Sequence, residues 1–148
     1  LAAHKAYVGG CRHKLYLIGG GQEEAQLRKM VEKRRMEHVV FLGYRQNPYG
    51  AMKKADLFVL PSLYEGFATV ISESLIVGTP VLSTDVSGAD EQIVAPYMGW
   101  VVENSQEGLD AGLLQALQDP SRLAAMKKQL AGYSYPNQEI VRQFMEVL

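Results

Sequence analysis

Two glutamates, Glu65 and Glu73, stand eight positions apart in the segment LPSLYEGFATVISES at residues 60–74. A carboxylate can accept hydrogen bonds from two vicinal hydroxyl groups, such as those of a sugar or a ribose. Gly66 directly follows the first glutamate, and a glycine lets a ligand approach the backbone closely. Together these residues favour recognition of a hydroxyl-rich ligand.

The same segment contains the expected beginning of a helix, near Ala68. The first amides of a helix have no acceptor within that helix, so those of Ala68, Thr69 and Val70 favour an anion, most naturally a phosphate. Carboxylates beside a phosphate would repel it, so we expect the two glutamates to face neutral hydroxyls. A ligand that carries both hydroxyls and phosphate fits this pattern.

Short apolar runs alternate with amphipathic stretches, which is the pattern of βαβ units and a parallel sheet with right-handed crossovers. The expected strands are residues 15–18, 39–42, 57–60, 80–83 and 99–102. The expected helices are residues 22–36, 48–55, 69–77, 90–94, 106–118, 121–130 with Ser121 as N-cap, and a C-terminal helix in residues 133–148 that begins at Pro136. Ligands bind outside the carboxyl ends of such strands, so the loop after residue 60 is expected at the binding edge.

The composition is typical of one soluble globular domain. Of 148 residues, 47% are hydrophobic and 21% are charged, and 15 basic against 16 acidic side chains give a net charge of −1. This balance excludes a strongly basic nucleic-acid-binding surface, and the single cysteine, Cys11, excludes a disulfide framework. No apolar run is long enough to span a membrane, and the first residues lack the pattern of a signal peptide. Leu1 in place of an initiator methionine predicts that the chain begins inside a larger protein.

Other chemistries find less support in the sequence. The glycines at residues 19–21 do not make a dinucleotide fingerprint, because its third glycine would fall at Glu24, and Gly20 is expected in a strand-to-helix turn near the ligand. Ser62 is not in the G-x-S-x-G turn of serine hydrolases. Asp56 and Asp85 at strand ends lack the acidic pair and lysine of a phosphoacceptor site.

The segment with the two glutamates resembles the family-4 glycosyltransferases, retaining enzymes of the GT-B fold. The resemblance is carried by E-x7-E, by P-S-x-x-E-G-F at residues 61–67, by G-T-P-V at residues 78–81 and by S-T-D at residues 83–85. It extends to residues 19–21, 41–43 and 54–61, and spans roughly residues 1–148. A lone E-x7-E is weak evidence, whereas this whole series in order is specific.

The resemblance implies a role for each matching residue. Glu65, the catalytic candidate, would accept a hydrogen bond from a hydroxyl of the donor sugar, and Glu73 would hold the ribose hydroxyls. The remaining donor-binding positions are the backbone of Gly66, Phe67 and Ala68 along the sugar, the amides of Thr69 and Val70 at the diphosphate, and Tyr44 and Arg45 against the nucleobase. Ala68 stands where the family more often has Gly or Pro, and residues 87–91 depart from Gly-Gly-x-x-Glu, so Glu91 receives no role.

In GT-B enzymes the acceptor binds an N-terminal domain and the nucleotide-sugar a C-terminal one, and this chain resembles the second. The family's sheet order is 3-2-1-4-5-6, in which residues 15–18 match strand 2 and residues 57–60 match strand 4. The fold class expected is therefore α/β, a doubly wound Rossmann-like parallel sheet without its first strand. The strands at 15–18 and 57–60 would pair directly, or another chain would fill the slot, or residues upstream of Leu1 would supply the strand; we favour the third. The Arg and Lys that clamp the diphosphate are expected upstream as well.

The sequence thus predicts the donor-binding part of a retaining hexosyltransferase of polysaccharide biosynthesis, inactive by itself. The substrate would be a nucleoside diphosphate sugar and the acceptor a glycan, lipid or small molecule. No metal or other cofactor is expected, because D-x-D is absent and the family that the chain resembles is typically metal-independent. The expected location is cytoplasmic, and peripheral association with the inner face of the membrane is compatible with it. The alternative is a non-catalytic nucleotide-binding α/β module. The sequence does not specify the nucleotide, the sugar, the acceptor or the linkage.

Overall fold

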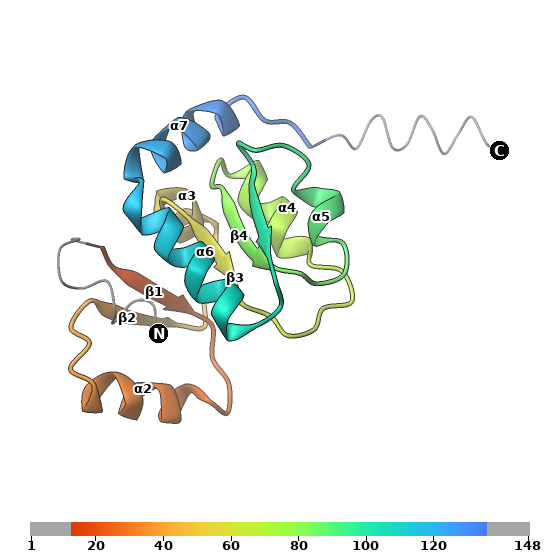
Figure 1. The fold of residues 1–148 in the computed structure, drawn as a ribbon. Coiled ribbons are helices and arrows are strands. Elements are labelled where there is room, and N and C mark those ends of the chain that lie inside the picture. The colour runs from red at the N-terminus through yellow and green to blue at the C-terminus, as the bar shows by residue number, and fades with distance from the viewer. Residues whose placement is uncertain (1–12, 136–148) are drawn as a thin grey trace.

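The computed structural model describes residues 13–135 (Figure 1). The strands are β1 (Leu15–Ile18), β2 (Val39–Gly43), β3 (Phe58–Leu60), β4 (Val81–Thr84) and β5 (Gly99–Val102). The helices are α2 (Glu24–Lys33), α3 (Tyr49–Lys54), α4 (Thr69–Ile76), α5 (Ala89–Gln92), α6 (Gln106–Gln118) and α7 (Pro120–Leu130). Strands and helices alternate up to β5, as the apolar pattern predicts.

The strands form two separate parallel sheets, β1–β2 and β3–β4–β5. In the first, Leu15 lies opposite Val39; in the second, Phe58 lies opposite Val81, which lies opposite Gly99. The α/β class, the parallel strands and the expected neighbours within each sheet are confirmed. Direct pairing of β1 with β3 does not occur in the described part of the chain, because β1 pairs with β2 and β3 with β4.

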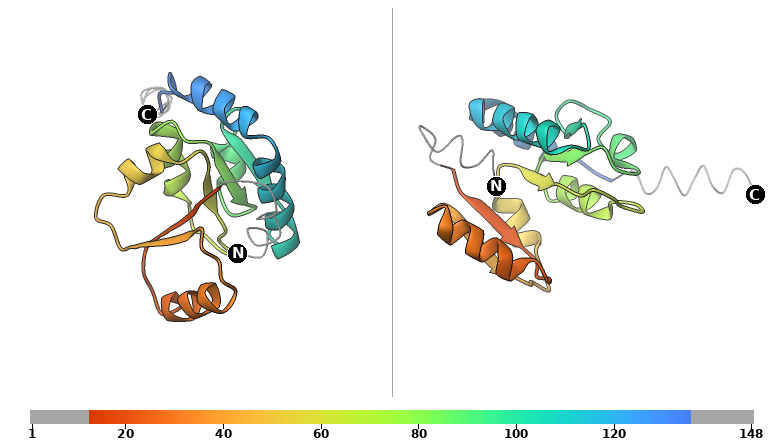
Figure 2. Two further views of the ribbon diagram at one scale, coloured as in Figure 1. Left: turned by 90° about the vertical axis from the view of Figure 1, so that its left-hand side faces the viewer. Right: turned by 60° about the horizontal axis from the view of Figure 1, so that its bottom comes forward.

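Helices cover both faces of the three-stranded sheet. Figure 2 shows α6 on one side of it, α4 on the other, and α7 running across the end of the sheet, with Leu130 of α7 in the cluster on the α4 side. On the α4 side, Ile71 and Leu75 pack with Val81 in a cluster of buried apolar residues. On the other side, buried residues of α6 and α7 pack against Trp100. The core thus lies around β4, the middle strand of this sheet.

Some predicted boundaries are wrong by one to three residues, and one cap is wrong. The helix expected at 22–36 is α2, and the one expected at 90–94 is α5. The N-cap of α7 is Asp119, whose side chain accepts a hydrogen bond from the Arg122 amide, and Ser121 lies inside the helix. Of the C-terminal helix predicted in residues 133–148, residues 133–135 are not helical, and its predicted start at Pro136 lies outside the described residues.

Candidate functional site

The loop between β3 and α4 lies at the carboxyl edge of the three-stranded sheet and carries Glu65. Glu65 is half-buried, and its Oε1 accepts a hydrogen bond of 2.7 Å from the hydroxyl of Ser62. The Ser62 carbonyl in turn accepts a 2.6 Å hydrogen bond from Thr84 Oγ1, at the end of β4. Thr84 is 3% exposed, so the loop is anchored to a buried group of the neighbouring strand.

A second anchor of this loop comes from the segment after β5. The side-chain amide of Asn104 donates to the Leu63 carbonyl at 2.9 Å and to the Asp85 carbonyl at 3.2 Å. Asn104 thereby connects the loop after β3 to the loop after β4. Hydrogen bonds from the end of β4 and from the segment after β5 fix the first half of the loop relative to the sheet.

The N-terminus of α4 follows the loop, and most of its first amides already have acceptors. Thr69 N donates to Phe67 O at 2.9 Å, Ile71 N to Ala68 O at 3.0 Å, and Ser72 N to Gln92 Oε1 at 3.2 Å. Neither the Ala68 amide nor the Val70 amide has an acceptor among residues 13–135, but Ala68 is 2% exposed whereas Val70 is half-buried. Val70 therefore carries the amide most available to an anion, whereas an anion at Thr69 would compete with the Phe67 carbonyl.

Glu73 lies in the second turn of α4 and is half-buried. The ion pair between Arg28 and Glu24 is the single one within residues 13–135. Neither Glu65 nor Glu73 therefore has a cationic partner in this part of the chain. Both carboxylates keep acceptor capacity for hydroxyl groups of a ligand.

The other predicted site residues belong to the two-stranded sheet. Gly20 follows β1, and Tyr44 and Arg45 follow β2; all three are exposed, Tyr44 to 82%. In Figure 1 the arrows of β1 and β3 point the same way, so the carboxyl ends of both sheets face one side of the molecule. The structure thus sets Gly20, Tyr44 and Arg45 on the same side as the Glu65 loop, but on a separate sheet.

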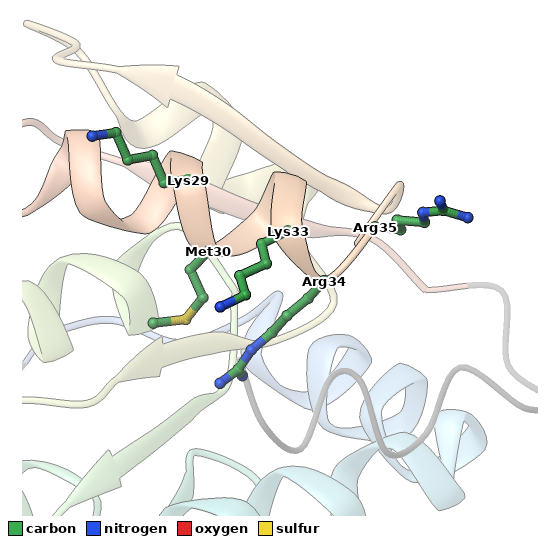
Figure 3. A pocket seen from close by; sticks show the side chains of 5 residues that line it. All are labelled: Lys29, Met30, Lys33, Arg34 and Arg35. Carbon is green, nitrogen blue, oxygen red and sulfur yellow. The ribbon is translucent and has the colours of Figure 1, made fainter.

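Two surface hollows lie in the described part of the molecule. One, of about 570 Å³, is lined by Lys29, Met30, Lys33, Arg34 and Arg35 at the end of α2, and the side chains of Met30, Lys33 and Arg34 extend from one side of that helix (Figure 3). No predicted site residue lines it. The other, of about 550 Å³, is lined by Phe67, Ser72, Glu91, Gln92, Val94, Tyr97, Met98 and residues 132–135. Phe67 thus connects the second hollow to the Glu65 loop.

Sequence reasoning missed three side chains that hold this region together, namely Thr84, Asn104 and Gln92. Each lies at or beyond the carboxyl end of β4 or β5, where side chains reach the adjacent loop. The signal in the sequence was the presence of hydrogen-bonding side chains just after these strands. Their partners on the Glu65 loop and on α4 lie 20 to 41 residues away, so no local spacing identifies them.

Two further findings concern the described residues. None of the helices in residues 13–135 is long and apolar enough to cross a membrane. Within the same residues, His, Cys, Asp and Glu side chains form no group of three or more that could hold a metal ion.

Comparison with known proteins identifies the family. The model of the family described as "Glycosyl transferases group 1" matches residues 11–131, and the chain belongs to this family. The chain is 35% identical, over an alignment of 158 positions, to the amylovoran biosynthesis glycosyltransferase AmsK of Erwinia amylovora, covering 95% of this chain and 37% of AmsK. It is 33% identical over 117 residues to the N-acetylgalactosamine-N,N'-diacetylbacillosaminyl-diphospho-undecaprenol 4-alpha-N-acetylgalactosaminyltransferase of Campylobacter jejuni, covering 77% and 32% respectively.

Solved structures agree on the fold. A variant of S. aureus TarM, in complex with Fondaparinux, alpha-GlcNAc-glycerol and UDP, matches with a TM-score of 0.76 and 20% identity, over 98% of this chain and 30% of that one. The fold is therefore that of a Rossmann-like half of a GT-B glycosyltransferase. The chain spans about a third of the length of these relatives.

Proposed function

We propose that this chain binds the nucleoside diphosphate sugar of a retaining, family-4 glycosyltransferase, as the C-terminal domain of a GT-B enzyme. The observation that carries the proposal is the free Val70 amide, which lies between Glu65 and Glu73 in the sequence, in the first turn of the helix that follows β3 of a parallel sheet. An amide available to an anion, flanked in the sequence by two carboxylates without a cationic partner, suits a ligand with phosphate in its middle and hydroxyl groups at both ends.

In this proposal Glu65 accepts a hydrogen bond from a hydroxyl of the sugar, and Glu73 accepts from the ribose hydroxyls. The C1–O bond to the diphosphate breaks with its electron pair moving to the diphosphate oxygen. The acceptor hydroxyl oxygen then bonds to C1, and its proton passes to the departing diphosphate oxygen. The Val70 amide and the N-terminal end of α4 stabilise the negative charge that develops on the leaving group.

The acceptor would be a glycan, a lipid or a small molecule bound by another domain, so we expect no sugar transfer by these 148 residues alone. Two relatives support this range: one is named for amylovoran biosynthesis, and the name of the other contains a diphospho-undecaprenol acceptor. A lipid-linked acceptor would bring the enzyme to the inner face of the membrane.

The test is calorimetric titration of the chain with UDP, GDP and ADP, which we expect to show binding of at least one. Glu73→Gln keeps the shape of the side chain but weakens its hydrogen bonds to the ribose diol. A hydrogen-bond set to a charged group contributes about 1.5–3 kcal/mol, so affinity should fall about 10–100-fold. Glu37→Gln, at an exposed glutamate before β2, is the matched control and should change nothing.

Failure of the parent chain to bind any of the three nucleotides would overturn the proposal and favour a different role for the α/β domain. Equal affinity of Glu73→Gln and parent would refute the ribose assignment alone. Glu65→Gln should leave binding of the bare nucleotide intact and weaken binding of the matching nucleotide sugar, which separates the two carboxylates.

A further inference from the structure

Gln92, at the end of α5, joins two segments that border the proposed donor site. Its side-chain oxygen accepts hydrogen bonds from the Ser72 hydroxyl at 2.5 Å and from the Ser72 amide at 3.2 Å. Its side-chain nitrogen donates to the Gly88 carbonyl at 2.9 Å. One half-buried amide thus satisfies groups on α4 and on the turn that begins α5.

The bond to Ser72 acts as a helix cap supplied from another helix. Ser72 is the fourth residue of α4, and the carbonyl four positions before it, that of Ala68 at the N-cap, accepts from the Ile71 amide instead. Ala68, at the N-cap position, makes no side-chain capping bond. Gln92 therefore holds the first turn of α4, next to the free Val70 amide and directly before Glu73.

The bond to Gly88 fixes the position of a second neighbour, Phe67. Gly88 has a φ of +75°, and a Cβ placed on it would lie 2.8 Å from two carbons of the Phe67 ring. The ring therefore lies directly against the Gly88 backbone. Phe67 immediately precedes Ala68 in the loop proposed to line the donor sugar, so the position of Gly88 limits where that loop can lie.

We infer that Gln92 is a positioning residue for donor binding: it couples α5 to α4 and keeps the Val70 amide, Glu73 and the Phe67 loop in their relative places. The inference rests on the proposed function. It assigns to Gln92 no contact with the donor. Its effect passes through Ser72 on one side and through Gly88 and Phe67 on the other.

The experiment compares five forms of the chain, including one double variant, in calorimetric titrations with UDP, well below the unfolding midpoint of every form. Gln92→Met keeps the length of the side chain and removes all three hydrogen bonds, and we expect UDP affinity to fall about 10-fold. Ser72→Ala removes only the hydroxyl bond, and we expect about a threefold fall. Gln129→Met, on the exposed face of α7, is the matched control and should bind as the parent does.

The double variant provides the coupling measurement. Because Gln92→Met already removes the partner of the Ser72 hydroxyl, adding Ser72→Ala should cause no further loss of affinity. A merely structural role would lower the unfolding midpoint but leave UDP affinity unchanged at a temperature where every form is folded. Faster hydrogen exchange of the Ser72 amide in Gln92→Met would support the capping step.

UDP affinity of Gln92→Met within twofold of the parent value would overturn the inference while leaving the proposed function intact. Full additivity of the two substitutions would also overturn it. If the parent binds neither UDP, GDP nor ADP, the proposed function fails and this inference fails with it. The parent titration therefore distinguishes the two failures.

Discussion

The two sheets differ in burial in a way that their sequences do not suggest. Strand β1 reads LYLI, yet two of its four residues are exposed, Tyr16 to 50% and Ile18 to 38%. Strand β4 reads VLST, and all four residues are buried, including Ser83 and Thr84. The more apolar strand is thus the more exposed one.

The difference comes from the layers around each strand. β4 has a hydrogen-bonded strand on each side, α4 packs on one face and α6 on the other. In the described chain β1 has one strand neighbour, β2. Helix α2 lies beside this pair in Figures 1 and 2, and none of its residues is buried. How deeply a strand is buried therefore depends on how many strands and helices pack around it. Ser83 and Thr84 tolerate burial because their hydroxyls donate to backbone carbonyls.

An isolated pair of strands is marginally stable in water, whereas a three-stranded sheet covered on both faces is a stable unit. We therefore expect the β3–β4–β5 sheet to determine the stability of the fold. Substitutions in the two sheets test this expectation.

The largest effect is expected for Gly99→Ala, where β5 begins. Gly99 has a φ of +146°, and a Cβ placed on it would lie 1.9 Å from the Val81 carbonyl oxygen of β4. The two strands cannot keep their pairing with a methyl group at this place. We expect a loss of at least about 3 kcal/mol in unfolding free energy, measured by urea denaturation.

Gly21→Ala is the control for this substitution in the other half of the molecule. Nothing lies within 4 Å of a Cβ at Gly21, so its free energy of unfolding should change by no more than about 0.5 kcal/mol. Equal losses for the two glycines would mean that both units are packed alike, contrary to the comparison.

The next largest effect concerns core leucines. Leu75 of α4 is fully buried against Val81, and Leu75→Ala should cost about 2–5 kcal/mol. Leu17 of β1 is only half-buried, so Leu17→Ala should cost about 1 kcal/mol or less. Denaturation of both variants under one set of conditions measures the ratio. A larger loss at Leu17 would assign a core role to the two-stranded sheet.

Amide hydrogen exchange compares the local stability of the two sheets without any substitution. The amides of β4 should exchange only on global unfolding, and those of β1 and β2 through local opening. We expect at least about 10-fold greater protection in β4, since tenfold corresponds to about 1.4 kcal/mol. Uniform protection across the two sheets would show that they open together.

Much of this fold could be predicted because its signals are local. Residues 15–18, 99–102 and 106–118 have the predicted bounds, since glycine or a capping residue marks their ends. The cap of α7 was predicted wrongly because Ser121 and Asp119 are both good caps, and Pro120 at the first helical position points to the residue before it. The separation into two sheets and the exposure of β1 depend on which layers surround each strand, which the apolar pattern does not contain.

The candidate site divides in the same way. Glu65, Gly66 and Glu73 belong to one continuous motif, so the sequence predicts the loop and helix that carry them, and their roles stay predictions. The connections of Gln92 to Ser72 and of Asn104 to Leu63 span 20 and 41 residues. Such contacts depend on how adjacent loops meet at the sheet edge, and no periodicity reports them.

The smallest expected effect is on the pH dependence of the unfolding midpoint, and it compares the N-terminus of α7 with that of α2. The Asp119 carboxylate caps α7, and its pKa lies below the usual 3.8 because the Ser121 hydroxyl and then the Arg122 amide donate to it. The N-cap of α2, Glu23, makes no such bond. Protonation therefore weakens a capping interaction at α7 that has no counterpart at α2.

The sign of the pH effect follows from the lowered pKa. A carboxyl group whose pKa is lower in the folded state stabilises the fold fully above its unfolded pKa and loses that contribution as pH falls through the folded value. Asp119→Asn keeps an oxygen acceptor for the Arg122 amide but cannot titrate. We expect the unfolding midpoint of the parent to fall more than that of Asp119→Asn on acidification through this range, whereas Glu23→Gln should follow the parent. A parent and an Asp119→Asn variant with parallel pH profiles would show that this cap contributes nothing that depends on its charge.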